Sequence, residues 1–302
     1  MKLYLITGFL GSGKSTFLKN FIRLFPDQRI YLIINEFGRE GVDGKLFAEL
    51  DAQLAEINNG SIFCSCRIEK FEEILRSVVG QRPDTILVEA SGLADPTGVN
   101  RVIGSIPQIE YAGSVCLCDA LRLHKVLSSS RSAAKQLAVS SLALVNKTDL
   151  ADEGQIALTE SLIRGINPDT QVERTSFGHI APEWLGFIKP LKGGGAEDAD
   201  PDLTLQKAIT GVNSAMTPTQ LGDFLRMFCA ETYRIKGFVR LGETVYLADC
   251  VGSDIKVTPW SGSVPESTGY LVILSGRGMA QRKALNAAAK AYPGLITSIS
   301  YG

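Results

Sequence analysis

The sequence predicts an α/β protein: a doubly wound, mostly parallel sheet followed by a small α+β domain. Two observations predict this class. Short, continuous apolar runs alternate with helical patterns through the first 190 residues, and strands that helices cover on both faces have this continuous character. A stretch rich in glycine and acidic residues then separates the alternating part from a final part of mixed strand and helix pattern.

The alternating part supplies predicted strands and helices in turn. Strands are expected at Leu3–Thr7, Ile30–Asn35, Thr85–Glu89, Ser114–Asp119 and Leu142–Asn146. Helices are expected at Ser15–Leu24, Ile68–Val79, Leu121–Ala138 and Gly154–Ile166. Asp119 is expected to start the helix that follows it, because a carboxylate can accept the first free N–H groups of a helix. Ligands of doubly wound sheets bind at the carboxyl ends of the strands, so functional residues are expected there.

The chain is expected to form two domains joined by a linker. Residues 1–191 form the first domain, residues 192–203 a flexible acidic linker and residues 204–302 the second domain. In the second domain a helix is expected from Thr217 or Pro218 to about Tyr233. The remaining elements are strands near Arg234–Arg240, Thr244–Cys250 and Tyr270–Leu274, and a last helix over Met279–Tyr292.

Composition excludes several classes of protein. Hydrophobic residues make up 45% and charged residues 21% of the 302 residues, as in ordinary globular proteins. The net charge of -1 provides no general attraction to nucleic acid or to an anionic membrane, so neither is expected as a partner. The sequence has no apolar run long enough for a transmembrane helix, and its six cysteines do not resemble a secreted disulfide framework. A cytoplasmic protein is expected.

A phosphate-binding motif stands between the first predicted strand and helix. Residues 8–16, GFLGSGKST, match G-x-x-x-x-G-K-[ST], the phosphate loop of P-loop NTPases. Glycines let backbone N–H groups turn toward phosphates, Lys14 can reach the β and γ phosphates, and the Ser15 hydroxyl can bind Mg²⁺. The residues expected to contact the phosphates are Gly8, Gly11, Ser12, Gly13, Lys14, Ser15 and Thr16.

A second motif predicts which base is bound. Asn146-Lys147-Thr148-Asp149 has the form N-K-x-D and follows a predicted strand. The Asp149 carboxylate can accept two hydrogen bonds from the guanine N1–H and 2-amino groups, which adenine cannot supply. The stem of Lys147 can lie over the base, and Asn146 can join this loop to the phosphate loop. Ser176, in the segment after a further short strand, is a candidate for additional guanine contacts.

Three further segments make the chain resemble a known family. Residues 35–38 (NEFG), 58–60 (NNG) and 89–96 (EASGLADP) have the order and spacing of the CobW family, P-loop GTPases related to HypB, UreG and MeaB. Tyr233–Val251 and Leu271–Leu285 also resemble its small C-terminal domain. The resemblance implies slow GTP hydrolysis coupled to the handling of a transition metal or a corrinoid cofactor. The implied partners are a client metalloprotein or corrinoid protein and, as one option, a second copy of the chain.

The resemblance also assigns roles at matching positions. Glu89 ends a predicted strand and can hold Mg²⁺ directly or through water. Gly92 can offer a backbone N–H near the γ-phosphate of GTP. Asp43 lies in a segment that resembles the first switch, where it would position water or Mg²⁺, with a plain turn aspartate as the alternative.

The segment expected to bind a transition metal departs from the family. The family motif is C-x-C-C after Asn-Gly, and here Ser61 and Phe63 replace its first two cysteines. Cys64 keeps the third position and Cys66 is an additional cysteine. With Glu36 these thiolates are candidate ligands for Zn²⁺ or Co²⁺. A redox pair or an unliganded loop is the alternative.

The other cysteines have a simpler interpretation. Cys116 and Cys118 alternate along a predicted buried strand and are expected in the core, as are Cys229 and Cys250.

Two alternatives to a GTPase switch stay open at this level. A P-loop kinase of a small molecule would make Asn146–Asp149 coincidental. An interaction module with negligible turnover would use the same phosphate loop, because that loop serves binding and hydrolysis alike.

Overall fold

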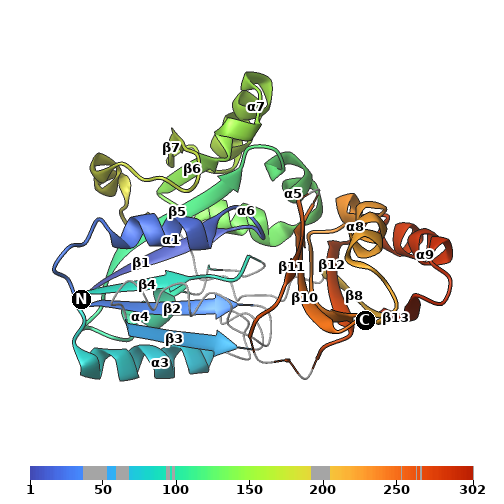
Figure 1. Ribbon diagram of the computed structural model, residues 1–302. Coiled ribbons are helices and arrows are strands. Elements are labelled where there is room, and N and C mark those ends of the chain that lie inside the picture. Colours follow the sequence, from blue (N-terminus) through green and yellow to red (C-terminus); the bar gives the residue numbers. More distant parts are fainter. Residues whose placement is uncertain are drawn as a thin grey trace. The chain divides into compact units, whose positions relative to one another are not determined.

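The computed structural model describes residues 1–36, 53–58, 68–92, 96, 99–191, 205–252, 254–262, 264–265 and 267–301. The chain divides into two compact units, Met1–Asp202 and Leu203–Gly302 (Figure 1). The segment expected as a linker, residues 192–203, lies outside the described residues.

The first unit is built on a parallel sheet. Within the described ranges the sheet has seven strands in the order β3-β2-β4-β1-β5-β6-β7, and every pair is parallel. The strands are β1 (Lys2–Gly8), β2 (Ile30–Glu36), β3 (Gln53–Asn58), β4 (Thr85–Glu89), β5 (Glu110–Asp119), β6 (Leu142–Asn146) and β7 (Gln171–Arg174). The strands β2, β3 and β4 lie on one side of β1, and β5, β6 and β7 lie on the other. The order of the strands therefore reverses at β1. Such a reversal is where doubly wound sheets bind ligands.

Helices cover both faces of this sheet (Figure 1). On one face α1 (Lys14–Ile22) packs through Phe17 and Phe21 onto Tyr4 and Ile6 of β1. The other face carries α3 (Ile68–Gln81), α4 (Val99–Gly104), α5 (Leu123–Ser129), α6 (Arg131–Ala138) and α7 (Glu153–Ile166). Short 3-10 turns occur at η3 (Thr148–Leu150) and η4 (Pro182–Phe187). The strands therefore have two buried faces, which explains their continuous apolar runs.

The second unit has an antiparallel sheet. Its described strands follow the order β11-β10-β9-β12-β8-β13. They are β8 (Leu205–Val212), β9 (Arg234–Leu241), β10 (Thr244–Val251), β11 (Asp254–Pro259), β12 (Tyr270–Gly276) and β13 (Ile296–Tyr301). The helices α8 (Pro218–Arg226) and α9 (Gln281–Ala291) pack on one face through Leu221, Phe224, Leu225, Leu285 and Ala288. The fold class predicted from the sequence, a doubly wound sheet followed by an α+β part, is confirmed.

Two predicted helices differ from the structure. The helix expected over Leu121–Ala138 is interrupted at Ser130, whose extended backbone (φ -134°, ψ 124°) separates α5 from α6. The preceding serines explain the break, because Ser128 and Ser129 bond their hydroxyls to the Lys125 carbonyl and such bonds compete with the helix.

The helix expected to reach Tyr233 begins as predicted, with a capping box between Thr217 and Gln220. It ends at Arg226, and a 3-10 turn, η5 (Cys229–Glu231), leads into β9. None of the helices within the described residues combines the length and apolar character needed to cross a bilayer.

Candidate functional site

The phosphate loop connects β1 to α1 at the centre of the parallel sheet. Its glycines adopt left-handed backbone angles, with φ of 134° at Gly8, 74° at Gly11 and 102° at Gly13. An added Cβ at Gly8 would lie 2.5 Å from the Leu117 carbonyl oxygen, so no other residue fits there without movement. Ser15 is partly exposed and Thr16 is exposed, both in the first turn of α1.

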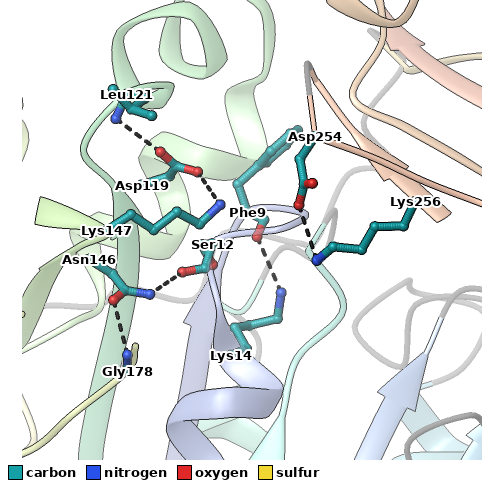
Figure 2. A network of polar contacts seen from close by, with 10 residues as sticks. All are labelled: Phe9, Ser12, Lys14, Asp119, Leu121, Asn146, Lys147, Gly178, Asp254 and Lys256. Carbon is teal, nitrogen blue, oxygen red and sulfur yellow. Dashed lines mark hydrogen bonds and ion pairs between the residues drawn. The ribbon is translucent and has the colours of Figure 1, made fainter. Parts of the chain in front are cut away.

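Lys14 is held against its own loop. Its ammonium donates to the carbonyl oxygens of Gly8 at 2.9 Å and Phe9 at 3.3 Å, and only 8% of the residue is exposed (Figure 2 shows the Phe9 contact). The hydroxyl of Ser12 is buried and has no hydrogen-bond partner among the residues that the structure describes. The loop thus gathers a buried cation and an unsatisfied hydroxyl at the amino end of a helix, a place where anions are stabilised.

Asn146 joins the phosphate loop to two other segments. Its amide nitrogen donates to the Ser12 carbonyl at 2.8 Å, and its amide oxygen accepts the N–H of Gly178 at 3.0 Å (Figure 2). An added Cβ at Gly13 would lie 2.4 Å from the Asn146 nitrogen. The Asn146 link to the phosphate loop that the sequence suggests is therefore present, with Gly178 as a further partner.

Lys147 and Asp149 follow Asn146 in a tight turn. Lys147 has a left-handed backbone (φ 65°), and its ammonium forms an ion pair at 2.7 Å with the Asp119 carboxylate (Figure 2). Asp149 is exposed in η3, at the carboxyl end of β6. A carboxylate at a strand end and open to solvent is accessible to a base edge.

Ser176 contacts this turn from the segment after β7. Its hydroxyl hydrogen-bonds the Thr148 hydroxyl at 2.9 Å and accepts the Asp149 N–H at 3.2 Å. The neighbouring Phe177 is 74% exposed with φ of 55°. Asn20 of α1 donates to the carbonyls of Phe177 and Gly178, at 3.1 and 3.0 Å. The structure thus brings together the phosphate loop, the N-K-x-D turn and the Ser176 segment.

Glu89 and Gly92 lie at the end of β4, the strand paired with β1. Glu89 is 8% exposed and aligns with Ile6 in the parallel ladder. An added Cβ at Gly92 would lie 2.6 Å from the Leu10 backbone nitrogen, so the segment after β4 touches the phosphate loop.

The remaining candidates fall where the structure gives no side-chain description. Asp43, Cys64 and Cys66 lie outside the described residues, and for Glu36 only the backbone at the end of β2 is described. Within the described residues, His, Cys, Asp and Glu form no group of three or more able to hold a metal ion.

Asp119 has a different place from the one expected. The helix α5 begins at Leu123, and Asp119 instead accepts the N–H of Leu121 at 2.9 Å while pairing with Lys147. Asp119 stands at the carboxyl end of a central strand, where ligands of doubly wound sheets bind, and this position could have marked it as a candidate site residue in the sequence. Gln136, a second buried polar residue, contacts Gly8 and Gly92, and no sequence motif marks it.

The cysteines within the described residues are buried, as predicted. Cys116 and Cys118 are 3% and 1% exposed on the β5 face that packs against α5–α7. Their sulfur atoms lie 3.9 Å apart. Cys229 and Cys250 lie in the core of the second unit, and burial raises the pKa of Cys250 to about 12.

The residues present fit a nucleoside triphosphate. The glycines stand where no Cβ would fit, the Ser12 hydroxyl has no hydrogen-bond partner among the described residues, and Lys14 supplies a cation. The Ser15 hydroxyl, in the first turn of α1, and the Glu89 carboxylate, at the end of β4, are oxygen ligands of the kind that Mg²⁺ prefers.

The amino-acid sequence matches a described protein family over more than half of its length. The profile of the CobW/HypB/UreG nucleotide-binding domain matches residues 2–174. The chain belongs to this family. The CobW/HypB/UreG match extends from β1 to β7, so it includes the phosphate loop and the N-K-x-D turn and confirms the resemblance drawn from the motifs.

Individual relatives share about a third of the aligned residues. The chain is 30% identical over 186 residues to the zinc chaperone YjiA of Escherichia coli strain K12, covering 58% of each protein. It is 32% identical over 179 residues to the zinc chaperone CobW of a Sinorhizobium species, covering 49% of this chain and 51% of that protein. The chain thus spans about half the length of these curated relatives. The crystal structure of Zn(II)-bound YjiA GTPase from E. coli aligns with a TM-score of 0.46 at 18% identity, covering 96% of this chain and 98% of that one.

Proposed function

We propose that this chain binds and hydrolyses GTP and uses the bound nucleotide to control the handling of a transition metal. The observation that carries the proposal is the pair of hydrogen bonds of Asn146, one of which holds the N-K-x-D turn against the phosphate loop while the other holds it to Gly178. Because the phosphate loop and the turn that would recognise the base are linked, the two together favour binding of a whole nucleotide over binding of phosphate alone.

Guanine recognition is assigned to the N-K-x-D turn and its neighbour. Asp149 accepts hydrogen bonds from the guanine N1–H and 2-amino groups, and the Lys147 stem covers the base. The contacts of Ser176 with Thr148 and the Asp149 N–H support its role in shaping this pocket. Adenine would leave the Asp149 carboxylate without hydrogen-bond partners. An unpaired polar group rejects the wrong base more strongly than a difference in apolar fit does.

Hydrolysis is assigned to residues around the phosphate loop. Water attacks the γ-phosphate in line with the leaving oxygen, and Lys14 with the loop N–H groups stabilises the charge that develops. Ser15 and Glu89 would hold Mg²⁺, which when bound neutralises charge on the phosphates. Gly92 offers its N–H toward the γ-phosphate, and Asp43 positions the attacking water.

The transition metal is assigned to Cys64, Cys66 and Glu36. Soft thiolates select Zn²⁺ or Co²⁺ over Mg²⁺, and three protein ligands leave a coordination position open for transfer. Because YjiA and CobW are named zinc chaperones, Zn²⁺ is the first ion to test. The recipient would be a client metalloprotein or corrinoid protein, with a second copy of the chain as a further partner.

Single-turnover phosphate release tests this function. The protein is mixed with GTP or ATP and Mg²⁺, with and without Zn²⁺ or Co²⁺, and phosphate is followed over time. We expect release from GTP at a rate that the transition metal changes, and little from ATP. Release dependent on a small-molecule acceptor would indicate a kinase, and tight GTP binding without release would indicate an interaction module.

A further inference from the structure

The carboxamide of Gln136 bridges two chain segments at the phosphate end of the sheet. The β1–β4 ladder ends at the pair Ile6–Glu89. Just beyond it, the Gln136 side-chain oxygen accepts the N–H of Gly8 at 3.2 Å, and its nitrogen donates to the carbonyl of Gly92 at 3.3 Å. The carboxamide therefore joins the last residue of β1 to the segment that follows β4, beyond the end of the β1–β4 ladder.

This bridge has a fixed orientation. Gly8 presents a donor and Gly92 an acceptor, so only one placement of the carboxamide oxygen and nitrogen satisfies both. Gln136 is fully buried. If either segment moved alone, a buried backbone group would lose its partner, and such groups are costly to leave unsatisfied.

Helix α6 holds Gln136 firmly in this place. The helix lies against β1 (Figure 1). One turn after Gln136, the Ser140 hydroxyl donates to the Gln136 backbone carbonyl at 2.7 Å and contacts the Thr7 hydroxyl at 3.3 Å. Thr7 directly precedes Gly8, so the support and the bridge act on the same stretch of β1.

The two bridged segments are also in direct contact. Gly92 approaches the backbone of Leu10 so closely that even a methyl group would not fit between them. A displacement of the phosphate loop is therefore transmitted to Gly92 by contact at Leu10 and by the hydrogen bonds of Gln136.

We propose that Gln136 is a positioning residue that couples the phosphate loop to Gly92 and thereby sets the preference for GTP over GDP. The inference rests on the proposed GTPase function, in which the Gly92 N–H meets the γ-phosphate. Gln136 is fully buried, with its carboxamide bonded to the backbone of Gly8 and Gly92, so it acts through these two segments. It fixes the Gly92 backbone relative to the loop, so that the N–H is already placed when a γ-phosphate is present.

The test compares two variants of Gln136 with a matched control. Gln136→Met removes both hydrogen bonds at similar volume, and Gln136→Glu keeps an acceptor for Gly8 but removes the donor to Gly92. The control is Asn167→Leu, which removes another buried amide, one that donates to the carbonyls of Leu137, Ala138 and Ser140 at the end of α6. Calorimetry gives the affinities for GDP and for a non-hydrolysable GTP analogue, and single turnover gives the rate.

We expect both Gln136 variants to lower the ratio of GTP-analogue to GDP affinity by about fivefold or more, the lower range of coupling between sites. The single-turnover rate should fall with it, while GDP affinity stays near that of the wild type. Asn167→Leu should lower the melting temperature and leave the ratio unchanged. An unchanged ratio in folded Gln136 variants would overturn the inference.

A measurement on the unmodified protein covers the case in which the variants do not fold. The side-chain amide protons of Gln136 should exchange with solvent more slowly with the GTP analogue bound than with GDP. Equal exchange in the two states would refute the coupling. If the wild type itself neither prefers nor hydrolyses GTP, the proposed function fails, which is a result distinct from a wild-type GTPase insensitive to Gln136.

Discussion

The Lys147 ammonium lies 2.7 Å from the Asp119 carboxylate, although the two residues are 28 positions apart: Asp119 ends β5 and Lys147 directly follows the neighbouring strand β6. Asp119 is 8% exposed, and its second carboxylate oxygen accepts the Leu121 N–H. The hydrogen bond to Leu121 therefore fixes the orientation of the carboxylate independently of Lys147. In the proposed guanine site this ion pair holds the Lys147 stem in one orientation across the base.

We predict that Asp119→Asn weakens GTP and GDP binding by the same factor. The amide keeps the volume but loses the charge, so Lys147 is no longer held in place. Because the pair is partly open to solvent, the expected loss is about 1 kcal/mol, or roughly fivefold in affinity. Calorimetry with both nucleotides measures it.

The matched control for Asp119→Asn is Glu160→Gln. Glu160 forms an ion pair with Arg174 at 2.6 Å, and neither residue belongs to the N-K-x-D turn. Glu160→Gln should leave the affinities for GTP and GDP unchanged. A changed GTP-to-GDP ratio in Asp119→Asn would contradict the role assigned to the pair, since base recognition does not depend on the γ-phosphate.

Asp149→Asn should change the preferred base from guanine to xanthine. The asparagine amide can donate to the 2-oxo group of xanthine, whereas it cannot accept both guanine hydrogen bonds. We expect GTP affinity to fall at least about a hundredfold and xanthosine triphosphate affinity to rise. Asp169→Asn, an exposed aspartate beyond α7, serves as the control. Equal wild-type affinity for ATP and GTP would refute the guanine assignment and favour a kinase.

Lys14→Ala should abolish hydrolysis while the fold is retained. Removing one fixed donor that stabilises transition-state charge typically costs about 2.7–4 kcal/mol, or a rate loss of about 10²–10³. Ser15→Ala should mainly weaken the Mg²⁺-dependent part of nucleotide binding. Lys19→Ala, on the same helix, removes a lysine from the last turn and is the control. Single-turnover phosphate release measures all three, and an unchanged rate in Lys14→Ala would contradict the mechanism.

The sequence predicts the central strands well because burial on two faces leaves a clear pattern. Thr85–Glu89 and Leu142–Asn146 are confirmed to the residue as β4 and β6. The strands β8, β11 and β13 of the second unit were not predicted. β11 and β13 consist of exposed and partly buried residues without a fully buried one, which leaves a weaker pattern than a continuous apolar run.

The site is predicted in part for a related reason. Phosphate loops and N-K-x-D turns are local in sequence, so their residues can be recognised without knowing the fold. The ion pair of Asp119 with Lys147 depends on the pairing of β5 with β6, and the Gln136 bridge depends on where α6 packs. Neither tertiary relationship leaves a periodic or motif signal.

The last prediction concerns the two cysteines of the altered family motif. Cys64 and Cys66 are expected to bind Zn²⁺ and Co²⁺ through their thiolates, so Co²⁺ titration of the nucleotide-free protein should produce thiolate-to-metal absorption. The double variant Cys64→Ser/Cys66→Ser should lose it. Cys250→Ala is the control, because burial raises the pKa of Cys250 to about 12 and a neutral thiol is a poor ligand at neutral pH. Identical spectra for the wild type and the double variant would refute metal binding by Cys64 and Cys66. Loss of the absorption in Cys116→Ala/Cys118→Ala instead would assign the metal to β5, where the two sulfur atoms lie 3.9 Å apart.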